Sequence, residues 1–187
     1  MGTYIKRGIL IIAMMLATPA FGAGPSVNEL VQLALSAAPP SISKDATVLV
    51  PGQDGNLVEA KKGGNGFTCL PDIPETPKPD PMCLDPAATQ WAMSLLKGEA
   101  KPSNTIPGIG YMARGGQHWE KDGKMFLKAE PGAKIVDEPP HWMIFWPFDS
   151  KTTALADTHT AKAYIMFEGT PYAHLMIHQD PKEVVGH

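Results

Sequence analysis

The sequence predicts an α+β fold with two short helices, a mainly antiparallel sheet and one disulfide. The 187 residues include 19 prolines and 18 glycines, which disfavour long helices and favour short strands joined by turns. Apolar residues follow a helical spacing in two stretches, whereas short apolar runs bounded by glycine or proline recur in the second half of the chain. Helices and strands that occur in separate runs indicate the α+β class.

Residues 1–23 have the three parts of a secretory signal peptide. Lys6 and Arg7 precede the uncharged run GILIIAMMLA, and mostly small residues follow it up to Ala23. The run is shorter than the roughly 20 apolar residues of a membrane-spanning helix, so we expect cleavage and not a retained anchor. Residues 24–187 are then expected to form a single extracytoplasmic globular domain, periplasmic or secreted, with no membrane segment.

The charge balance narrows the class of partner. The net charge of the whole chain is −3 with neutral histidines, and loss of Lys6 and Arg7 with the signal peptide would lower it to about −5. No stripe of basic residues follows, so nucleic acid is not expected as a partner. The partner classes that remain possible are a small ligand, a metal ion and another protein.

Two helices are marked by their capping residues. The first is expected to begin after Ser26, which forms a capping box with Glu29, and to end before the prolines at 39–40. The second is expected to begin at the Asp-Pro pair at 85–86, where aspartate caps the helix and proline occupies its first position. Gly98 is a suitable C-terminal stop for this second helix.

Several strands are predicted from short runs of aliphatic, β-branched and aromatic residues. The clearest pair is a hairpin in which strands 46–50 and 56–61 flank a Gly-Gln-Asp-Gly turn. Most of the proline-rich segment between Cys69 and Cys83 is expected to be a solvated loop. Further strands are expected over residues 109–113, 124–128, 142–146, 163–167 and 173–177.

The two cysteines, Cys69 and Cys83, are expected to form a disulfide, because export places them in an oxidising compartment. The alternative is a pair of metal thiolates, but two lone cysteines without a CxxC motif make poor zinc spacing. The loop that the disulfide closes has about 15 residues, for which chain entropy gives roughly 3 kcal/mol. Five prolines already stiffen this loop, so the gain should be smaller.

The most distinctive functional signal is a repeated His-x-Met-Ile motif. It occurs as His141-Trp-Met143-Ile and again as His174-Leu-Met176-Ile, each in or beside a predicted strand. Residues two apart on a strand point to the same face, so each histidine shares a face with its methionine. If the strands are neighbours, these four side chains form a candidate metal site, and imidazole with thioether suits copper, especially Cu(I). The competing interpretation is a buried core, with methionine as filler and histidine bonded to the backbone.

Three other histidines are weaker candidates. His118 and His159 lie in expected loops and are spare ligands. His178 shares a face with His174 but lies about 13 Å further along the strand, so it is not expected to bind the same ion.

The leading hypothesis is a non-enzymatic binding protein, with copper or another soft metal as its ligand. The chain contains no GxSxG, HExxH or phosphate-loop motif. The first alternative is an enzyme of unrecognised type in which His141 or His174 acts as a general base. Its partner would be one of three aspartates, Asp72, Asp85 or Asp137. The second alternative is a structural or interaction module whose contact surface is the proline-rich disulfide loop.

Five short motifs are spread over most of the chain beyond the signal peptide. In chain order they are Cys69 to Asp72 (CLPD), Pro81 to Asp85 (PMCLD), Tyr111-Met112, Pro140 to Met143 (PHWM) and Thr170 to Met176 (TPYAHLM). This series resembles a group of exported bacterial proteins with no assigned activity, although the first motif carries one inserted residue here. The resemblance implies a single domain and implies no catalytic residue.

Overall fold

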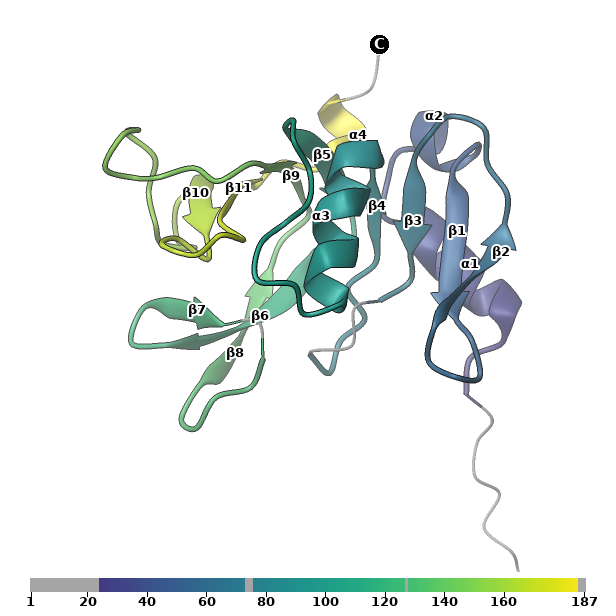
Figure 1. The fold of residues 1–187 in the computed structure, drawn as a ribbon, viewed down its shortest axis with the longest axis horizontal. Coiled ribbons are helices and arrows are strands. Elements are labelled where there is room, and N and C mark those ends of the chain that lie inside the picture. Colours follow the sequence, from purple (N-terminus) through teal and green to yellow (C-terminus); the bar gives the residue numbers. More distant parts are fainter. Residues whose placement is uncertain (1–23, 73–75, 127, 185–187) are drawn as a thin grey trace, which may run out of the picture.

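The computed structural model describes residues 24–72, 76–126 and 128–184, and it has the predicted α+β fold (Figure 1). A large mixed sheet of eight strands, most of them antiparallel, is accompanied by a second sheet of three strands and by two helices of more than seven residues. The predicted signal peptide, residues 1–23, lies outside the described residues. Within those residues, none of the helices has the length and apolar character needed to cross a membrane.

The first helix, α1 (Val27–Leu35), begins as its capping box predicted. The Ser26 hydroxyl accepts a hydrogen bond from the backbone N–H of Glu29, and the Glu29 carboxylate accepts one from the backbone N–H of Ser26. This helix ends at Leu35, before the prolines at 39–40, and a further helical turn, α2 (Pro40–Ser43), starts at the second proline. Proline is tolerated there because the first position of a helix needs no N–H donor.

The second long helix, α3 (Pro86–Leu96), is fixed to the large sheet by its capping residue. One oxygen of Asp85 accepts a hydrogen bond from the Ala88 N–H at 2.7 Å, and the other accepts one from the Ile109 N–H at 2.9 Å. Gly98, with a φ of 68°, ends the helix in the left-handed conformation that glycine adopts without strain. The predicted start and stop of this helix are therefore confirmed.

The large sheet has the strand order β10-β11-β9-β5-β4-β3-β1-β2, and only the β1–β3 pair is parallel. The small sheet has the order β7-β6-β8. A short helix, α4 (Pro181–Val184), follows the last strand. The strand bounds are β1 (Thr47–Pro51), β2 (Leu57–Lys61), β3 (Thr68–Leu70), β4 (Met82–Leu84), β5 (Gly108–Met112), β6 (Gly116–Lys121), β7 (Lys124–Phe126), β8 (Lys134–Glu138), β9 (His141–Phe145), β10 (Ala163–Met166) and β11 (His174–Ile177).

Four of these strands differ from the expectation. β3 and β4 form the base of the segment expected to be a loop, and only residues 77–79 of its described part are exposed. β6 and β8 were not predicted because their sequences, GQHWEK and KIVDE, are largely polar. They pair with each other over five residue pairs, and this pairing brings together side chains that the sequence left in separate loops.

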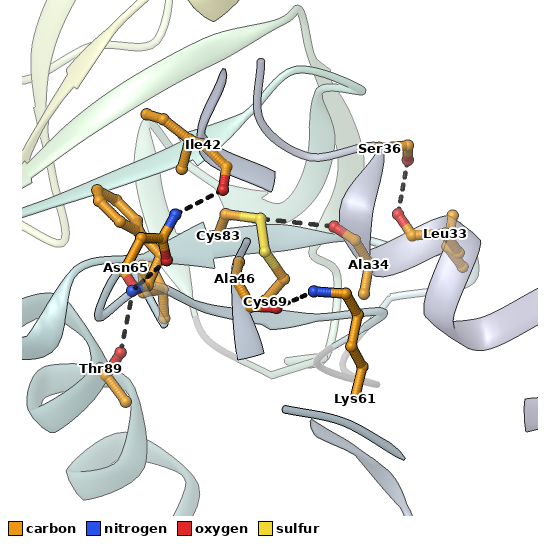
Figure 2. Close-up of a disulfide and its surroundings, with 12 residues drawn as sticks. Leu33, Ala34, Ser36, Ile42, Ala46, Lys61, Asn65, Cys69, Cys83 and Thr89 are labelled. Carbon is orange, nitrogen blue, oxygen red and sulfur yellow. Dashed lines mark hydrogen bonds between the residues drawn. A yellow bond between two sulfur atoms is a disulfide. The ribbon is translucent and has the colours of Figure 1, made fainter. Parts of the chain in front are cut away.

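The predicted disulfide is present and links two strands directly. Cys69 on β3 lies opposite Cys83 on β4, with their Cα atoms 4.0 Å apart. Figure 2 shows the bond beside α1, where the sulfur of Cys83 lies 3.6 Å from the Ala34 carbonyl oxygen. Close by, the Lys61 ammonium donates a hydrogen bond to the Ala46 carbonyl at 2.7 Å. The cross-link therefore lies in a region that is also held by contacts between separate elements.

The two long helices cover opposite faces of the large sheet. Adjacent residues of a strand point to opposite faces, and in β3 Cys69 belongs to the α1 side whereas Leu70 belongs to the α3 side. Figure 1 shows α3 in front of the large sheet and α1 behind β1. The α3 side carries a cluster of apolar residues that includes Trp91, Met112, Met143, Phe145, Tyr164, Met166 and Met176. The functional candidates lie on this side.

Candidate functional site

The strands that carry the two His-x-Met motifs are neighbours, as the predicted metal site required. β9 and β11 pair in antiparallel fashion, and Met143 lies directly opposite Met176. Both methionines, together with His141 and His174, are buried and line one cavity of about 230 Å³. The pairing register nevertheless places the two histidines at opposite ends of the paired strands β9 and β11, since Leu175 pairs with Ile144. The thioethers therefore face each other, whereas the imidazoles do not.

The two imidazoles of the motif are held in the same way. His141 Nδ1 lies 2.7 Å from the Pro139 carbonyl oxygen, and His174 Nδ1 lies 3.0 Å from the Tyr172 carbonyl oxygen. With Nδ1 as the donor, Nε2 keeps its lone pair for another partner. Burial lowers the pKa of each ring to about 4, so both rings are neutral at pH 7.

The surroundings of the two rings differ. The His174 ring lies among aromatic rings, with centroid distances of 5.0 Å to Trp91, 5.1 Å to Phe145 and 5.6 Å to Phe167. His141 is 1% exposed, and its Nε2 has no hydrogen-bond partner among the described residues. His174 is thus packed as an aromatic side chain, whereas His141 retains a buried nitrogen without a partner.

The cavity is rich in methionine, and we call it the methionine cavity. Five methionines line it, contributed by β4, β5, β9, β10 and β11 (Met82, Met112, Met143, Met166 and Met176). Pairing across the sheet sets Met143 opposite Met176 and Met112 opposite His141. These side chains project from one face of the sheet, because Met143 and His141 lie two residues apart on the same strand.

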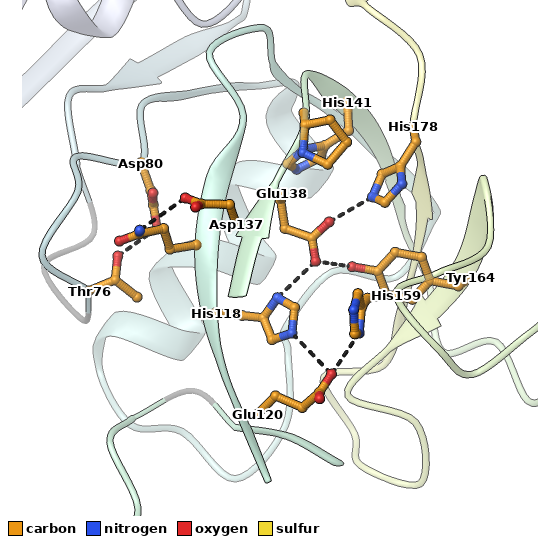
Figure 3. Close-up of polar contacts among 12 residues, drawn as sticks. Thr76, Asp80, His118, Glu120, Asp137, Glu138, His141, His159, Tyr164 and His178 are labelled. Carbon is orange, nitrogen blue, oxygen red and sulfur yellow. Dashed lines mark hydrogen bonds and ion pairs between the residues drawn. The ribbon is translucent and has the colours of Figure 1, made fainter. Parts of the chain in front are cut away.

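A second group of side chains, which we call the His/Glu cluster, consists of His118, Glu120 and His159 (Figure 3). His118 and Glu120 lie two residues apart on β6 and so share a face. Glu120 Oε2 lies 2.6 Å from His159 Nδ1 and 3.9 Å from His118 Nε2. One ligand atom from each residue lies within 4.8 Å of the other two, which is a spacing that a metal ion can bridge.

A buried carboxylate, Glu138, contacts His118 on the side of its ring away from Glu120. Its Oε1 lies 2.8 Å from His118 Nδ1 and accepts a hydrogen bond from the Tyr164 hydroxyl at 2.6 Å, while its Oε2 lies 2.7 Å from His178 Nε2. The contact with His118 has hydrogen-bonding distance, although its angle departs from that of a regular hydrogen bond. Figure 3 shows His118 between Glu138 and Glu120, so each ring nitrogen faces a carboxylate.

The titration of Glu138 reflects these contacts. Burial alone would raise the pKa of its carboxyl group, but the contacts with His118 and Tyr164 outweigh burial and lower the pKa. Burial and the neighbouring carboxylate raise the pKa of the Tyr164 hydroxyl. Tyr164 is therefore a neutral donor to an ionised carboxylate at pH 7.

The aspartates considered as partners of a general base lie elsewhere. Asp85 caps α3, Asp72 accepts a hydrogen bond from the backbone of Asp80 at 3.0 Å, and Asp137 accepts one from Gln117 at 3.0 Å. The carboxylates that contact histidine are instead Glu120 and Glu138. At His141 and His174, main-chain carbonyl oxygens contact Nδ1 in the place where a general base would have its aspartate.

Sequence reasoning missed the role of both glutamates. The only local signal was the His-x-Glu spacing at 118–120, which places both side chains on one face if the segment is a strand. His178, which was set aside, contacts Glu138, and His159 contacts Glu120 from the long connection between β9 and β10. All five histidines of the described residues thus line the methionine cavity or contact Glu120 or Glu138 (His118, His141, His159, His174 and His178).

Comparison with protein-family models, with curated proteins and with solved structures found no match. The resemblance to exported bacterial proteins therefore stays a prediction. Function has to be inferred from the chemistry of the side chains described above.

Proposed function

We propose that this protein is a metal-binding protein that holds a divalent transition-metal ion in the His/Glu cluster. The observation that supports the proposal is the convergence of two imidazole nitrogens and one carboxylate oxygen, all within 4.8 Å of one another. Two histidines and one glutamate form a known ligand set for zinc and for other first-row metals. The proposal agrees with the non-enzymatic binding protein expected from the sequence, and it moves the ion to other residues.

An unpaired nitrogen distinguishes the cluster from a simple buried network. His118 is 4% exposed, its Nε2 has no hydrogen-bond partner among the described residues, and 3.9 Å to Glu120 is too long for a hydrogen bond. Such a buried nitrogen costs folding free energy unless something binds it. An ion between the two side chains would use its lone pair.

The outer contacts also suit an ion. Metal-bound histidines commonly place a carboxylate on their second ring nitrogen, which fixes the ring and raises its basicity. Glu138 has this position relative to His118. Glu120 and Glu138 are both buried, and the ammonium of the exposed Lys134 lies 3.6 Å from Glu120 Oε1. A divalent cation would add to this charge balance.

The ligand chemistry selects a borderline metal at this cluster. Imidazole suits zinc, copper, iron and nickel, and the carboxylate does not favour a soft monovalent ion. Cu²⁺ binds nitrogen and oxygen ligands more tightly than Zn²⁺ in the Irving–Williams order. The side chain of His159 is 29% exposed, which gives an ion a route from solvent. Copper, which the sequence suggested, therefore fits here as Cu²⁺.

Titration calorimetry of the purified protein with Zn²⁺ and with Cu²⁺ tests the proposal. We expect one ion per chain at this cluster, with an affinity that His159→Ala weakens by more than about 100-fold, the upper limit for loss of an outer contact. Glu168→Gln is the control, because Glu168 is a half-buried carboxylate outside the cluster whose partner is Ser150. It should leave the affinity unchanged.

A stability measurement separates binding from misfolding. Excess Zn²⁺ should raise the melting temperature of the wild type and of Glu168→Gln, because an ion that binds only the folded state stabilises it. His159→Ala should fold without metal and show no such rise. Equal affinity in His159→Ala and the wild type, or no binding by the wild type, would contradict the proposal.

A further inference from the structure

The methionine cavity has a composition that a hydrophobic core does not require. The sequence has seven methionines beyond residue 23, and five of them line this one space. Methionine fills irregular gaps in cores, but it also offers a soft, polarisable sulfur. Both cysteines form the disulfide on the other face of the sheet, so the sulfur atoms that face the cavity are thioethers.

Pairing across strands brings the thioethers and an imidazole together. Met143 and Met176 lie directly opposite each other, and side chains in such positions have Cβ atoms about 5 Å apart. His141 lies two residues from Met143 on the same face, with Met112 opposite it on β5. One imidazole and three flexible thioethers on neighbouring strands thus line the same cavity.

The buried nitrogen of His141 is the second, independent observation. The ring is fixed by the 2.7 Å contact between Nδ1 and the Pro139 carbonyl oxygen, and the residue is 1% exposed. Its Nε2 has no hydrogen-bond partner among the described residues, and the side chain lines the cavity. A buried polar atom without a partner calls for an explanation, and a ligand in the cavity supplies one.

We infer that the methionine cavity is a second metal site, selective for Cu(I), in which Met143, Met176 and His141 are the ligands. Thioether and imidazole prefer this soft ion, whereas zinc and other harder divalent ions bind better to the nitrogen and oxygen atoms of the His/Glu cluster. Met112 is a further thioether within the same group. His174, which the sequence placed in this set, packs among aromatic rings and is not a ligand of this ion. The inference does not depend on the proposed function of the His/Glu cluster.

The test measures Cu(I) affinity by competition with a chromophoric Cu(I) chelator under ascorbate. The double variant Met143→Leu/Met176→Leu should weaken Cu(I) binding by more than about 100-fold, by the same reasoning on lost ligands. Leucine conserves volume, so the fold should persist. Met93→Leu is the matched control, because Met93 is a partly buried methionine of α3 outside the cavity, and it should bind Cu(I) like the wild type.

A second pair of measurements separates the two sites. His159→Ala should keep Cu(I) affinity while losing Zn²⁺, and the methionine double variant should keep Zn²⁺ while losing Cu(I). X-ray absorption of the Cu(I) form should show sulfur ligands that the double variant lacks. Wild-type Cu(I) affinity in the double variant, loss of Cu(I) in His159→Ala, or no Cu(I) binding by the wild type would overturn the inference.

Discussion

The two faces of the large sheet are packed with different kinds of side chain. Under α1, small residues such as Ala34 and Ala46 pack against the Cys69–Cys83 disulfide. Under α3, long methionines leave a cavity of about 230 Å³, and His141 Nε2, which has no hydrogen-bond partner in the described part of the chain, is buried there. Small, cross-linked residues maximise contact, whereas flexible side chains keep space for a ligand. The α1 face is thus closed by small residues and a cross-link, whereas the α3 face keeps the space that the proposed Cu(I) site would use.

The largest effect on stability is expected when the disulfide on the α1 face is removed, and this change tests whether the two faces are independent. Cys69→Ala/Cys83→Ala should lower the free energy of unfolding by up to about 3 kcal/mol, because the loop gains entropy in the unfolded chain. Urea denaturation measures the loss. Zn²⁺ and Cu(I) affinities, measured well below the melting temperature, should stay at the wild-type values. A large fall in either affinity would show that the two faces are not separable.

On the α3 face, a buried acid should make stability depend on pH. Burial raises the pKa of Asp80 from its ordinary value of 3.8 to about 6, so the folded protein holds this proton more tightly than the unfolded chain. The contribution of Asp80 to stability is therefore greatest below pH 4 and declines as the pH rises to about 6. The free energy of unfolding of Asp80→Asn should exceed that of the wild type by about 2 kcal/mol at pH 7. Each pKa unit corresponds to about 1.4 kcal/mol, and the roughly 3 kcal/mol that the shift implies is reduced by solvent screening of this partly accessible group.

The control for the Asp80 prediction is the same pair of proteins at acid pH. Below about pH 4 both carry a neutral side chain at this position, so their unfolding free energies should converge. Other acids change the absolute stability of both proteins alike, and so the difference between them is the quantity to measure. A constant difference from pH 4 to pH 7 would contradict the raised pKa.

Beside the α3 face, Tyr164→Phe tests the support of the His/Glu cluster. It removes the hydroxyl that donates to Glu138 at 2.6 Å and leaves a buried carboxylate with one donor fewer. We expect a loss of about 1.5 kcal/mol in unfolding free energy and a 10- to 100-fold loss of Zn²⁺ affinity, typical of an outer contact to a metal ligand. Tyr111→Phe, which alters a buried tyrosine on the α1 face, should leave Zn²⁺ affinity unchanged.

The smallest effect is expected at the start of α1. Ser26→Ala removes the hydroxyl that caps the Glu29 N–H and should cost about 1 kcal/mol of unfolding free energy. Thermal denaturation would detect it as a small fall in melting temperature. Both metal affinities should equal those of the wild type, because this cap lies at the exposed end of the helix on the α1 face.

Features with a local cause could be read from the sequence. The capping box at Ser26, the Asp85 cap of α3 and the hairpin of β1 and β2 each depend on residues close in sequence, and all three are present. The disulfide followed from the number of cysteines and the expected compartment. Such signals act within a few residues and do not need the rest of the fold.

The candidate site depended on pairings that local signals do not encode. β6 has few β-branched or aliphatic residues, so nothing marked it as a strand, and His118 was expected in a loop. Glu138 reaches His118 only because β8 pairs with β6. The strands that carry the His-x-Met repeat are neighbours, which the metal-site hypothesis required but the repeat did not predict. The register that separates His141 from His174 comes from the sheet as a whole.

The connection between β8 and β9 joins the two proposed ions through four consecutive residues. Glu138 contacts His118, and the carbonyl oxygen of Pro139 contacts His141. Pro140 lies between Pro139 and His141 in the chain. Proline rings fix the backbone angle φ, so this pair of prolines makes the connection stiff. If metal binding to the His/Glu cluster moves Glu138, the stiff connection would transmit this movement to the imidazole of His141 in the methionine cavity. We therefore expect thermodynamic coupling, in which each metal changes the affinity for its counterpart by the same factor.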